Sequence, residues 1–144
     1  MYKSLSIKVV FLVFAIFVAA ISCKKEDVAP EETPLLLLTS NQWSFSGVSV
    51  TGSDVNIFLE LGVKTLYGGS TFSFDSEGGS IRTTSSSSIT GTWAFANEET
   101  AIIYTEDATG PLDWTIIELS ATILKVSYID SSSGAEITLT FNPG

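Results

Sequence analysis

The chain contains no histidine and only one cysteine among its 144 residues. Without histidine, catalysis by Ser-His-Asp or Cys-His groups is excluded, and so are the common imidazole metal sites. The sequence also lacks the Gly-x-x-x-x-Gly-Lys and Gly-x-Gly-x-x-Gly loops that hold phosphate groups. We therefore expect no cofactor and no metal, and we expect the protein not to be an enzyme.

The single cysteine, Cys23, follows an apolar run of thirteen residues, 9–21, and one serine. A run of this length is too short for a membrane-spanning helix, which needs about 20 apolar residues, and it matches the core of a secretory signal. The segment Ala20-Ile21-Ser22-Cys23 resembles the lipobox of bacterial lipoproteins, in which the cysteine receives the lipid and becomes the first residue. An uncleaved anchor and an ordinary secretory signal are the alternatives.

The lipobox divides the chain into three parts. Residues 1–22 are predicted to be a cleaved signal peptide, 23–34 a lipidated flexible tether, and 35–144 one domain. By resemblance to Gram-negative lipoproteins, Lys24 after the cysteine favours the outer membrane, and Lys24-Lys25-Glu26-Asp27 is similar to a short tag for its outer face. The predicted location is the outer membrane, with palmitate-type lipid on Cys23, on the periplasmic face or the cell surface.

Positive charge is scarce in the mature part. Five basic residues stand against sixteen acidic ones after residue 22, a formal charge of −11. Nucleic acid needs basic residues to replace phosphate counterions, and adsorption on anionic lipid needs them too. We expect no nucleic-acid partner, and attachment to the membrane through the lipid alone.

From Trp43 onward, short runs rich in Val, Ile, Thr and aromatic residues alternate with clusters of Gly, Asn, Asp and Ser. Alternation with period two, as in Ile137, Leu139 and Phe141, predicts antiparallel strands with one buried face. The short links predict a meander, and closure would remove its two edges. The predicted fold class is all-β, a single small up-and-down barrel of about eight strands, near residues 43–50, 71–75, 80–84, 89–96, 100–105, 112–119, 122–129 and 135–141.

Two segments are ambiguous. Residues 54–66 alternate like a strand at Val55, Ile57 and Leu59, but they also fit helical spacing with Ser53 or Asp54 as the N-cap. We favour the strand. Leu35 to Thr39 fits either a short helical turn that plugs one end of the fold or a lead-in to the first strand.

This order of features resembles the lipocalin-like domain of small Gram-negative lipoproteins. The resemblance rests on Trp43 after a Leu-rich lead-in, on Thr71-Phe72-Ser73-Phe74-Asp75 with a glycine turn, on Gly91-Thr92-Trp93, and on the strands around Trp114 and Val126. It implies an up-and-down barrel with a closed or narrow interior over residues 35–144. The Gly-x-Trp motif lies mid-chain here, whereas lipocalins carry it on the first strand.

The aromatic residues are the main candidates for a site, because they recur about once per strand. A barrel of about eight strands is just wide enough to be filled by side chains or to hold one small ligand. The candidate ligand-lining residues are Trp43, Phe45, Phe72, Phe74, Trp93, Phe95 and Trp114; core packing is the plainer interpretation.

The acidic residues are weaker candidates, because most fall in predicted turns, where acids are ordinarily solvated. They are Glu98 with Glu99, Glu106 with Asp107, and Asp75 with Glu77, the last with a faint similarity to a calcium loop. Glu60 and Glu118 lie between apolar residues and are expected to face outward. The serine runs 85–88 and 131–133 are expected to be loops.

Three functions follow from these features. The favoured one is a non-enzymatic, membrane-anchored binder of a small apolar ligand. The alternative is a protein-interaction module of the cell envelope, or an inhibitor, with a solid barrel and contact loops 83–90 and 106–111. A hydrolase built on carboxylates is the third.

Overall fold

The computed structural model describes residues 31–52, 54, 56–107 and 110–144. The predicted signal peptide and Cys23 lie outside the described residues. Residues Glu32–Gly144 form one compact unit, which contains every helix and strand described here. Within this unit, no helix has both the length and the apolar character needed to cross a membrane.

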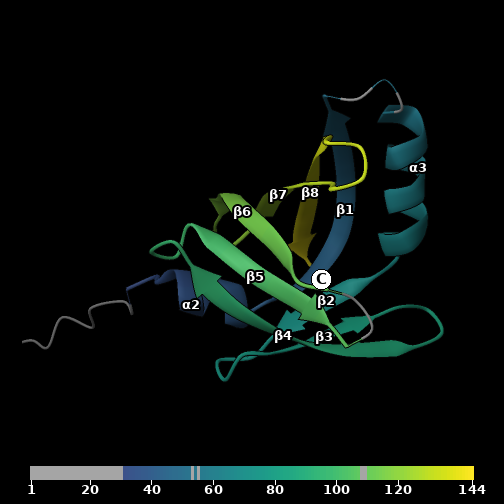
Figure 1. Ribbon diagram of the computed structural model, residues 1–144. Coiled ribbons are helices and arrows are strands. Elements are labelled where there is room, and N and C mark those ends of the chain that lie inside the picture. The colour runs from purple at the N-terminus through teal and green to yellow at the C-terminus, as the bar shows by residue number, and fades with distance from the viewer. Residues whose placement is uncertain (1–30, 53, 55, 108–109) are drawn as a thin grey trace, which may run out of the picture. The chain divides into compact units, whose positions relative to one another are not determined.

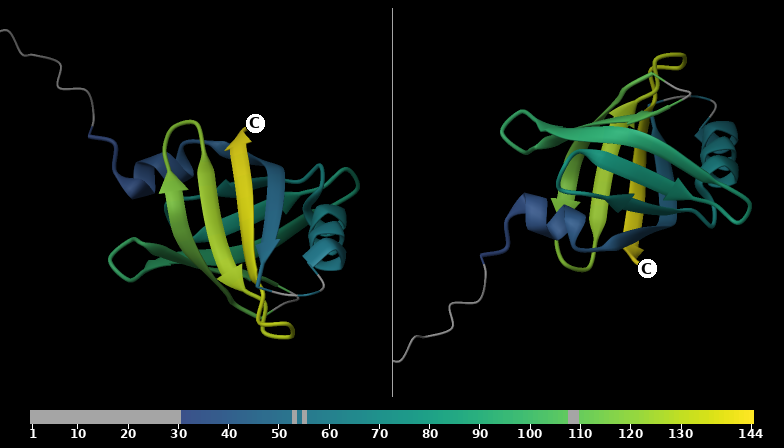
Figure 2. Two further views of the ribbon diagram at one scale, coloured as in Figure 1. Left: turned by 90° about the horizontal axis from the view of Figure 1, so that it is seen from above. Right: turned by 90° about the horizontal axis from the view of Figure 1, so that it is seen from below.

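Eight antiparallel strands form a closed barrel (Figures 1 and 2). Each strand pairs with the next along the chain, and the last pairs with the first over most of its length. This confirms the predicted up-and-down barrel and its eight strand positions. The strands are β1 (Gln42–Thr51), β2 (Thr71–Phe74), β3 (Gly79–Thr83), β4 (Ser88–Ala96), β5 (Ala101–Glu106), β6 (Leu112–Leu119), β7 (Leu124–Ile129) and β8 (Glu136–Pro143).

The strand favoured for residues 54–66 is wrong, because the segment folds as helix α3 (Asn56–Tyr67). The side chains that pack on the core are Leu59, Val63 and Tyr67, spaced four residues apart as a helix requires. Gly68 and Gly69 follow the helix, and Gly69 has a φ of +72°, the left-handed conformation that often ends helices.

Helix α3 lies beside a short β1–β2 ladder. Strand β1 pairs with β2 only over Gln42–Ser44, because β2 begins at Thr71 opposite Ser44. The rest of β1 is paired on its other side with β8, and α3 packs against it. The helix therefore covers the wall where β1 has no β2 neighbour, as the two views in Figure 2 show.

Helix α2 (Pro34–Thr39) fulfils the helical alternative for the Leu-rich segment. Thr33 caps it, since the Thr33 hydroxyl accepts a hydrogen bond from the Leu36 N–H at 3.2 Å. The helix contacts β2 and β6, which lie on opposite sides of an eight-stranded barrel. It therefore crosses one end, which we call the proximal end, and it inserts fully buried Leu38 there.

The opposite, distal end is where β1, β3, β5 and β7 finish. The hairpins after β3 and β7 turn at this end, and β5 ends and β6 begins there as well. The serine runs 85–88 and 131–133 fall in or beside the two hairpin turns. The contact segments proposed from sequence, residues 83–90 and the described part of 106–111, also belong to the distal end.

Candidate functional site

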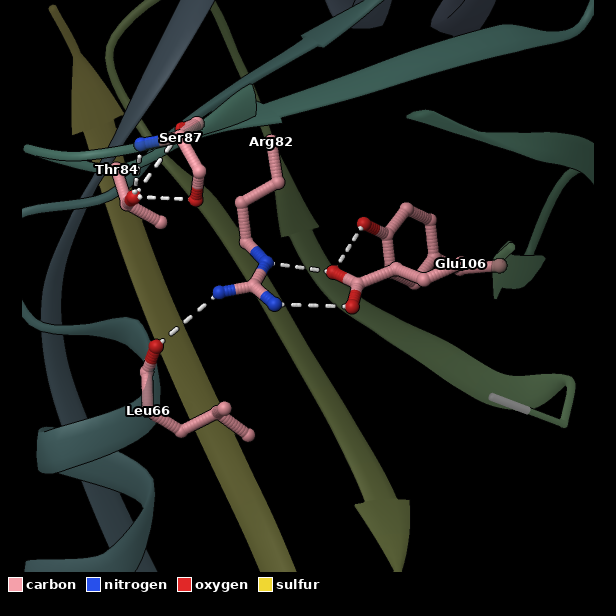
Figure 3. A network of polar contacts seen from close by, with 6 residues as sticks. Leu66, Arg82, Thr84, Ser87 and Glu106 are labelled. Carbon is pink, nitrogen blue, oxygen red and sulfur yellow. Dashed lines mark hydrogen bonds and ion pairs between the residues drawn. The ribbon is translucent and has the colours of Figure 1, made fainter. Parts of the chain in front are cut away.

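A buried ion pair lies inside the distal end of the barrel. Arg82 on β3 donates two hydrogen bonds to the carboxylate of Glu106 on β5, from Nε at 2.5 Å and from Nη2 at 2.9 Å (Figure 3). Tyr104 Oη donates a third bond to the same carboxylate at 2.8 Å. The Arg82 and Glu106 side chains are only 5% and 10% exposed. In this bidentate geometry each charge compensates the other, whereas either charge buried alone would destabilise the folded protein.

Arg82 also joins this pair to helix α3. Its Nη1 donates to the carbonyl oxygen of Leu66 at 3.2 Å, in the last turn of the helix. Its guanidinium lies 5.3 Å from the centre of the Tyr67 ring, within range of a cation–π contact. One side chain thus links β3, β5 and the C-terminal end of α3, where a positive charge is favourable.

The surroundings shift the pKa values of these groups in consistent directions. Burial raises the pKa of Glu106, but the hydrogen bonds from Arg82 and Tyr104 outweigh it and leave that pKa below its usual value. The hydrogen bond to Glu106 raises the pKa of Arg82 despite burial. Burial raises the pKa values of Tyr67 and Tyr104. The cluster is therefore a fixed salt bridge with neutral phenols at neutral pH, which favours a structural role over acid–base chemistry.

The expectation that Glu106 is a solvated turn acid is wrong. It is the last residue of β5, and its side chain points inward because the strand alternates through Ile102 and Tyr104. The neighbouring Asp107 does lie at the surface, where its carboxylate accepts a hydrogen bond from the Thr90 hydroxyl. The sequence signal for Glu106 was the period of two in β5, which continues from Ile102 and Tyr104 to the next inward-facing position.

The other acidic candidates lie at the surface, apart from one another. Asp75 Oδ1 accepts hydrogen bonds from the N–H groups of Glu77 and Gly79 at 2.9 and 2.7 Å, which closes the hairpin turn. Glu98 and Glu99 lie in the hairpin turn between β4 and β5 and are exposed. Glu118 is exposed, and Glu60 lies on α3 rather than on a strand, 2.6 Å from Lys64. No group of three or more acidic or cysteine side chains in the described residues is arranged to hold a metal ion.

The seven predicted ligand-lining residues all belong to the barrel core. Trp43, Phe72, Phe74, Trp93 and Trp114 are buried, and Phe45 and Phe95 are partly buried against them. Six of these rings, all but that of Trp43, belong to a network of ring contacts that also includes Tyr67, Tyr104 and Phe141, with centroids 4.6 to 6.3 Å apart. The contacting pairs are 45–67, 45–141, 67–72, 72–104, 72–114, 72–141, 74–93, 74–104, 93–95, 104–114 and 114–141. Such spacings are those of rings in mutual contact.

Two of the rings also anchor backbone. Trp43 Nε1 donates to the carbonyl of Leu38 at 2.9 Å and so fastens α2 to the barrel. Trp93 Nε1 donates to the carbonyl of Asp75 at 3.0 Å across the hairpin turn. Both indole rings therefore have structural roles, and these roles do not depend on whether the barrel binds a ligand.

The outer face of α3 is strongly apolar. Ile57, Phe58, Leu61 and Leu66 are 80%, 77%, 62% and 54% exposed. A shallow hollow of about 240 Å³ on this helix is lined by Ile57, Glu60, Leu61 and Lys64. We call these six residues the α3 face. Sequence reasoning missed it because a strand was favoured there.

A second hollow lies between β6 and β7 at the distal end, with a volume of about 470 Å³. We call it the β6–β7 groove. It is lined by Pro111, Leu112, Asp113, Thr115, Ser127, Tyr128, Ile129, Asp130, Ser131 and Glu136. None of the seven predicted aromatic residues lines either hollow.

Comparison with known proteins finds similarity only at the level of three-dimensional structure. No family model matches the chain, and no curated protein matches it. Among solved structures, the chain is similar to a DUF4847 family protein from Bacteroides vulgatus, with a TM-score of 0.47 and 10% sequence identity. That alignment covers 74% of this chain and 96% of the other.

Proposed function

We propose that the protein is a lipid-anchored, non-enzymatic interaction module of the cell envelope. On this proposal Cys23 carries the lipid, the barrel is a packed scaffold, and the α3 face docks an apolar-faced helix of a partner protein. The exposure of four large apolar side chains on one short helix carries the proposal. Contiguous exposed apolar surface marks interaction sites far more often than isolated apolar residues do.

The shape of the α3 face favours a helix as the partner. Its hollow is bounded by positions 57, 60, 61 and 64, the spacing i, i+3, i+4 and i+7. Four residues at this spacing form the hole that receives a side chain from a facing helix in knobs-into-holes packing. Phe58 and Leu66 extend the apolar surface on the side away from Glu60 and Lys64.

The charges favour a protein over a lipid surface. Lys64 is the only basic residue of α3, and Glu60 neutralises it at 2.6 Å. Helices that lie in a membrane interface usually carry several Lys or Arg residues on their polar face. With a formal charge of −11 after residue 22, the protein lacks the electrostatic attraction that such helices use.

Site-specific photo-crosslinking of the full chain in cells tests the docking. The photoreactive residue replaces Leu61, or Ile117 as a control that is also exposed (51%) but lies on β6. We expect position 61 to crosslink an apolar-faced helix of one protein, a second copy of this chain included, and Phe58→Glu to abolish that product. Lipid adducts alone at position 61, or equal products at both positions, would refute the docking.

Replacement of the cysteine tests the anchor separately. We expect Cys23→Ser to abolish labelling by a palmitate analogue and to move the chain out of the membrane fraction. Label that persists in Cys23→Ser would place the lipid on another residue, and a parent chain that takes up no label would exclude the lipid. Because the docking surface lies on α3, its test and the anchor test can fail independently.

A small ligand inside the barrel is the second candidate function, and one observation favours it. The Trp114 Nε1 and the Ser80 hydroxyl are buried without a hydrogen-bond partner among the described residues. Buried polar groups nearly always have partners, so a guest or a buried water would satisfy them. Native mass spectrometry decides this: excess mass that is lost on denaturation supports a ligand, and a clean mass after exposure to envelope lipids excludes one from that source.

A further inference from the structure

The outward side of α3 contains a glycine that the fold of a single copy does not require. Gly62 lies in the middle of the helix, is exposed, and has no positive φ. An added Cβ at this position would meet nothing within 4 Å. Glycine in a helix interior costs about 1 kcal/mol relative to alanine. Since no contact among the described residues explains this cost, the missing side chain favours a molecule that approaches α3 closely at Gly62.

The residues around Gly62 make this side of the helix apolar. Phe58 and Leu61 are 77% and 62% exposed. Thr65 is exposed too, and its hydroxyl donates to the Leu61 carbonyl at 2.8 Å, so its hydrogen-bonding need is met within the helix. The outward side therefore carries two large side chains, at 58 and 61, followed by two small residues, at 62 and 65.

This order of sizes is complementary to itself when the helix direction is reversed. If two copies of α3 pack antiparallel about a two-fold axis between positions 61 and 62, Phe58 of each copy lies opposite Thr65 of the other. Leu61 likewise lies opposite Gly62. Each large side chain then faces a small residue, as close packing requires. In a parallel pair Phe58 would meet Phe58, and a gap would remain between the two glycines.

The charges of α3 favour the same antiparallel arrangement. Glu60 and Lys64 lie one turn apart on one flank of the helix. About the same axis, Glu60 of each copy lies beside Lys64 of the other, which gives two pairs of opposite charge across the interface. In a parallel pair this flank would face the opposite flank of the second helix, where Gly62 and Leu66 carry no charge.

The expected interface is small. A helix of 12 residues is about 18 Å long. One pair of such helices buries less than the roughly 800 Å² per partner of a standard interface, so the pair is weak between freely diffusing molecules. Chains held on one membrane surface meet at a higher effective concentration, which the proposed lipid on Cys23 would provide.

We propose that the partner at the α3 face is a second copy of this chain, bound through an antiparallel α3–α3 pair. The two-fold axis passes between Leu61 and Gly62, Phe58 packs on Thr65 of the other copy, and Glu60 with Lys64 closes one rim. This inference rests on the proposed docking function and identifies the partner in it.

Disulfide trapping of the full chain in cells tests this geometry. Along the helix axis of an antiparallel pair, residue 61 lies about 2 Å from its own counterpart, and residue 65 about 10 Å from its own. A disulfide needs Cα atoms roughly 4.4–6.8 Å apart. On mild oxidation, Leu61→Cys should therefore dimerise and Thr65→Cys should not. Co-expressed Phe58→Cys and Thr65→Cys chains, carrying different tags, should form a mixed dimer.

Two controls set the background of this experiment. The parent chain measures any disulfide through Cys23, its only cysteine. Ile117→Cys measures random collision, because Ile117 is 51% exposed but lies on β6. We expect Thr65→Cys alone to give no more dimer than Ile117→Cys. The replaced side chains on α3 are all exposed, so these variants should fold as the parent does.

Charge reversal in the Leu61→Cys chain tests the rim. Lys64→Glu and Glu60→Lys should each lower the dimer yield about fivefold, because like charges then meet across the interface. Mixing the two variants should restore a mixed dimer, since one copy then carries two acidic side chains and the other two basic ones. The pair within each helix stays broken in both variants, so only contact between copies explains the rescue.

The outcomes separate this inference from the docking function. If Leu61→Cys gives no more dimer than Ile117→Cys while photo-crosslinking at position 61 captures a helix of another protein, the second copy is overturned and the docking function stands. Equal dimer from Leu61→Cys and Thr65→Cys would indicate a parallel pair and overturn the proposed arrangement. No product at position 61 by either method would overturn both.

Discussion

The buried pair of Arg82 and Glu106 offers the sharpest test of how this barrel is held together. Glu106→Gln keeps the shape of the side chain and an acceptor for the Tyr104 hydroxyl, but it removes the negative charge. Arg82 would then keep its hydrogen bond to the Leu66 carbonyl and its contact with the Tyr67 ring. The Arg82 side chain, which is only 5% exposed, would keep its positive charge but would lose the carboxylate that pairs with it.

The expected loss is large relative to total stability. Removal of one partner from a buried pair costs about 3–5 kcal/mol, because the remaining charge is left without compensation. A unit of 113 residues, Glu32–Gly144, unfolds with a free energy of about 6–17 kcal/mol at typical values per residue. The variant should therefore still fold, with its Tm lowered by about 4 °C for each kcal/mol.

The loss should depend on pH. The pKa of Glu106 is lower in the folded protein than in the unfolded chain, so its contribution to stability is complete above the unfolded value, near 4.3. As pH falls through the lower folded value, Glu106 takes up a proton and the parent protein comes to resemble the glutamine variant. The difference between the two should therefore shrink below about pH 4.

Urea unfolding followed by circular dichroism measures this on the unit Glu32–Gly144, for parent and variant at pH 7 and at pH 3. The double change Arg82→Met with Glu106→Leu is the control, and it should cost less than Glu106→Gln because no charge is left buried. A loss below about 1 kcal/mol at pH 7, or a loss that does not change with pH, would refute the reasoning.

Three further predictions concern single contacts. Gly91→Ala should cost about 1–3 kcal/mol, because an added Cβ would meet the backbone carbonyl of Thr105; a melting curve measures it, with Gly110→Ala, in open space, as the control. Trp43→Phe should cost about 1–3 kcal/mol, since the buried carbonyl of Leu38 loses its donor, and hydrogen exchange in α2 should accelerate more than in β7. Leu61→Glu should leave the melting temperature nearly unchanged, because that side chain is 62% exposed; a drop of more than a few degrees would mean that α3 needs its outer face in order to fold.

The strands could be predicted because several of them, such as β2 and β8, alternate apolar and polar residues, and the others are rich in β-branched and aromatic residues. Strand β8 is the clearest case, with Ile137, Leu139 and Phe141 buried and the residues between them not buried. The turns could also be predicted from their own residue types, as the segment from Asp75 to Gly79 shows. From β2 onward, period-two patterns and short links were sufficient to determine the topology.

The polar cluster could not be predicted from the same pattern. In β3 the alternation offers Ile81 as the natural inward residue, yet Ile81 is 45% exposed, while Ser80 and Arg82 are buried. The pairing of β3 with β2 settles this, because Arg82 lies opposite Phe72, whose ring belongs to the core. Only the three-dimensional arrangement brings Glu106 and the end of α3 to the same place, and these two partners make an inward arginine acceptable.

The misreading of residues 54–66 has the same cause as the proposed docking function. A helix that serves only the core carries apolar residues on one face, and its period of 3.6 is then plain. In α3 the inward stripe of Leu59, Val63 and Tyr67 is matched by apolar residues on the outward side, so alternation with period two fits as well. Burial in this chain needs only the inward stripe. The proposed docking gives the outward residues an apolar partner, and on that proposal the ambiguity in the sequence reflects a helix with two faces to bury.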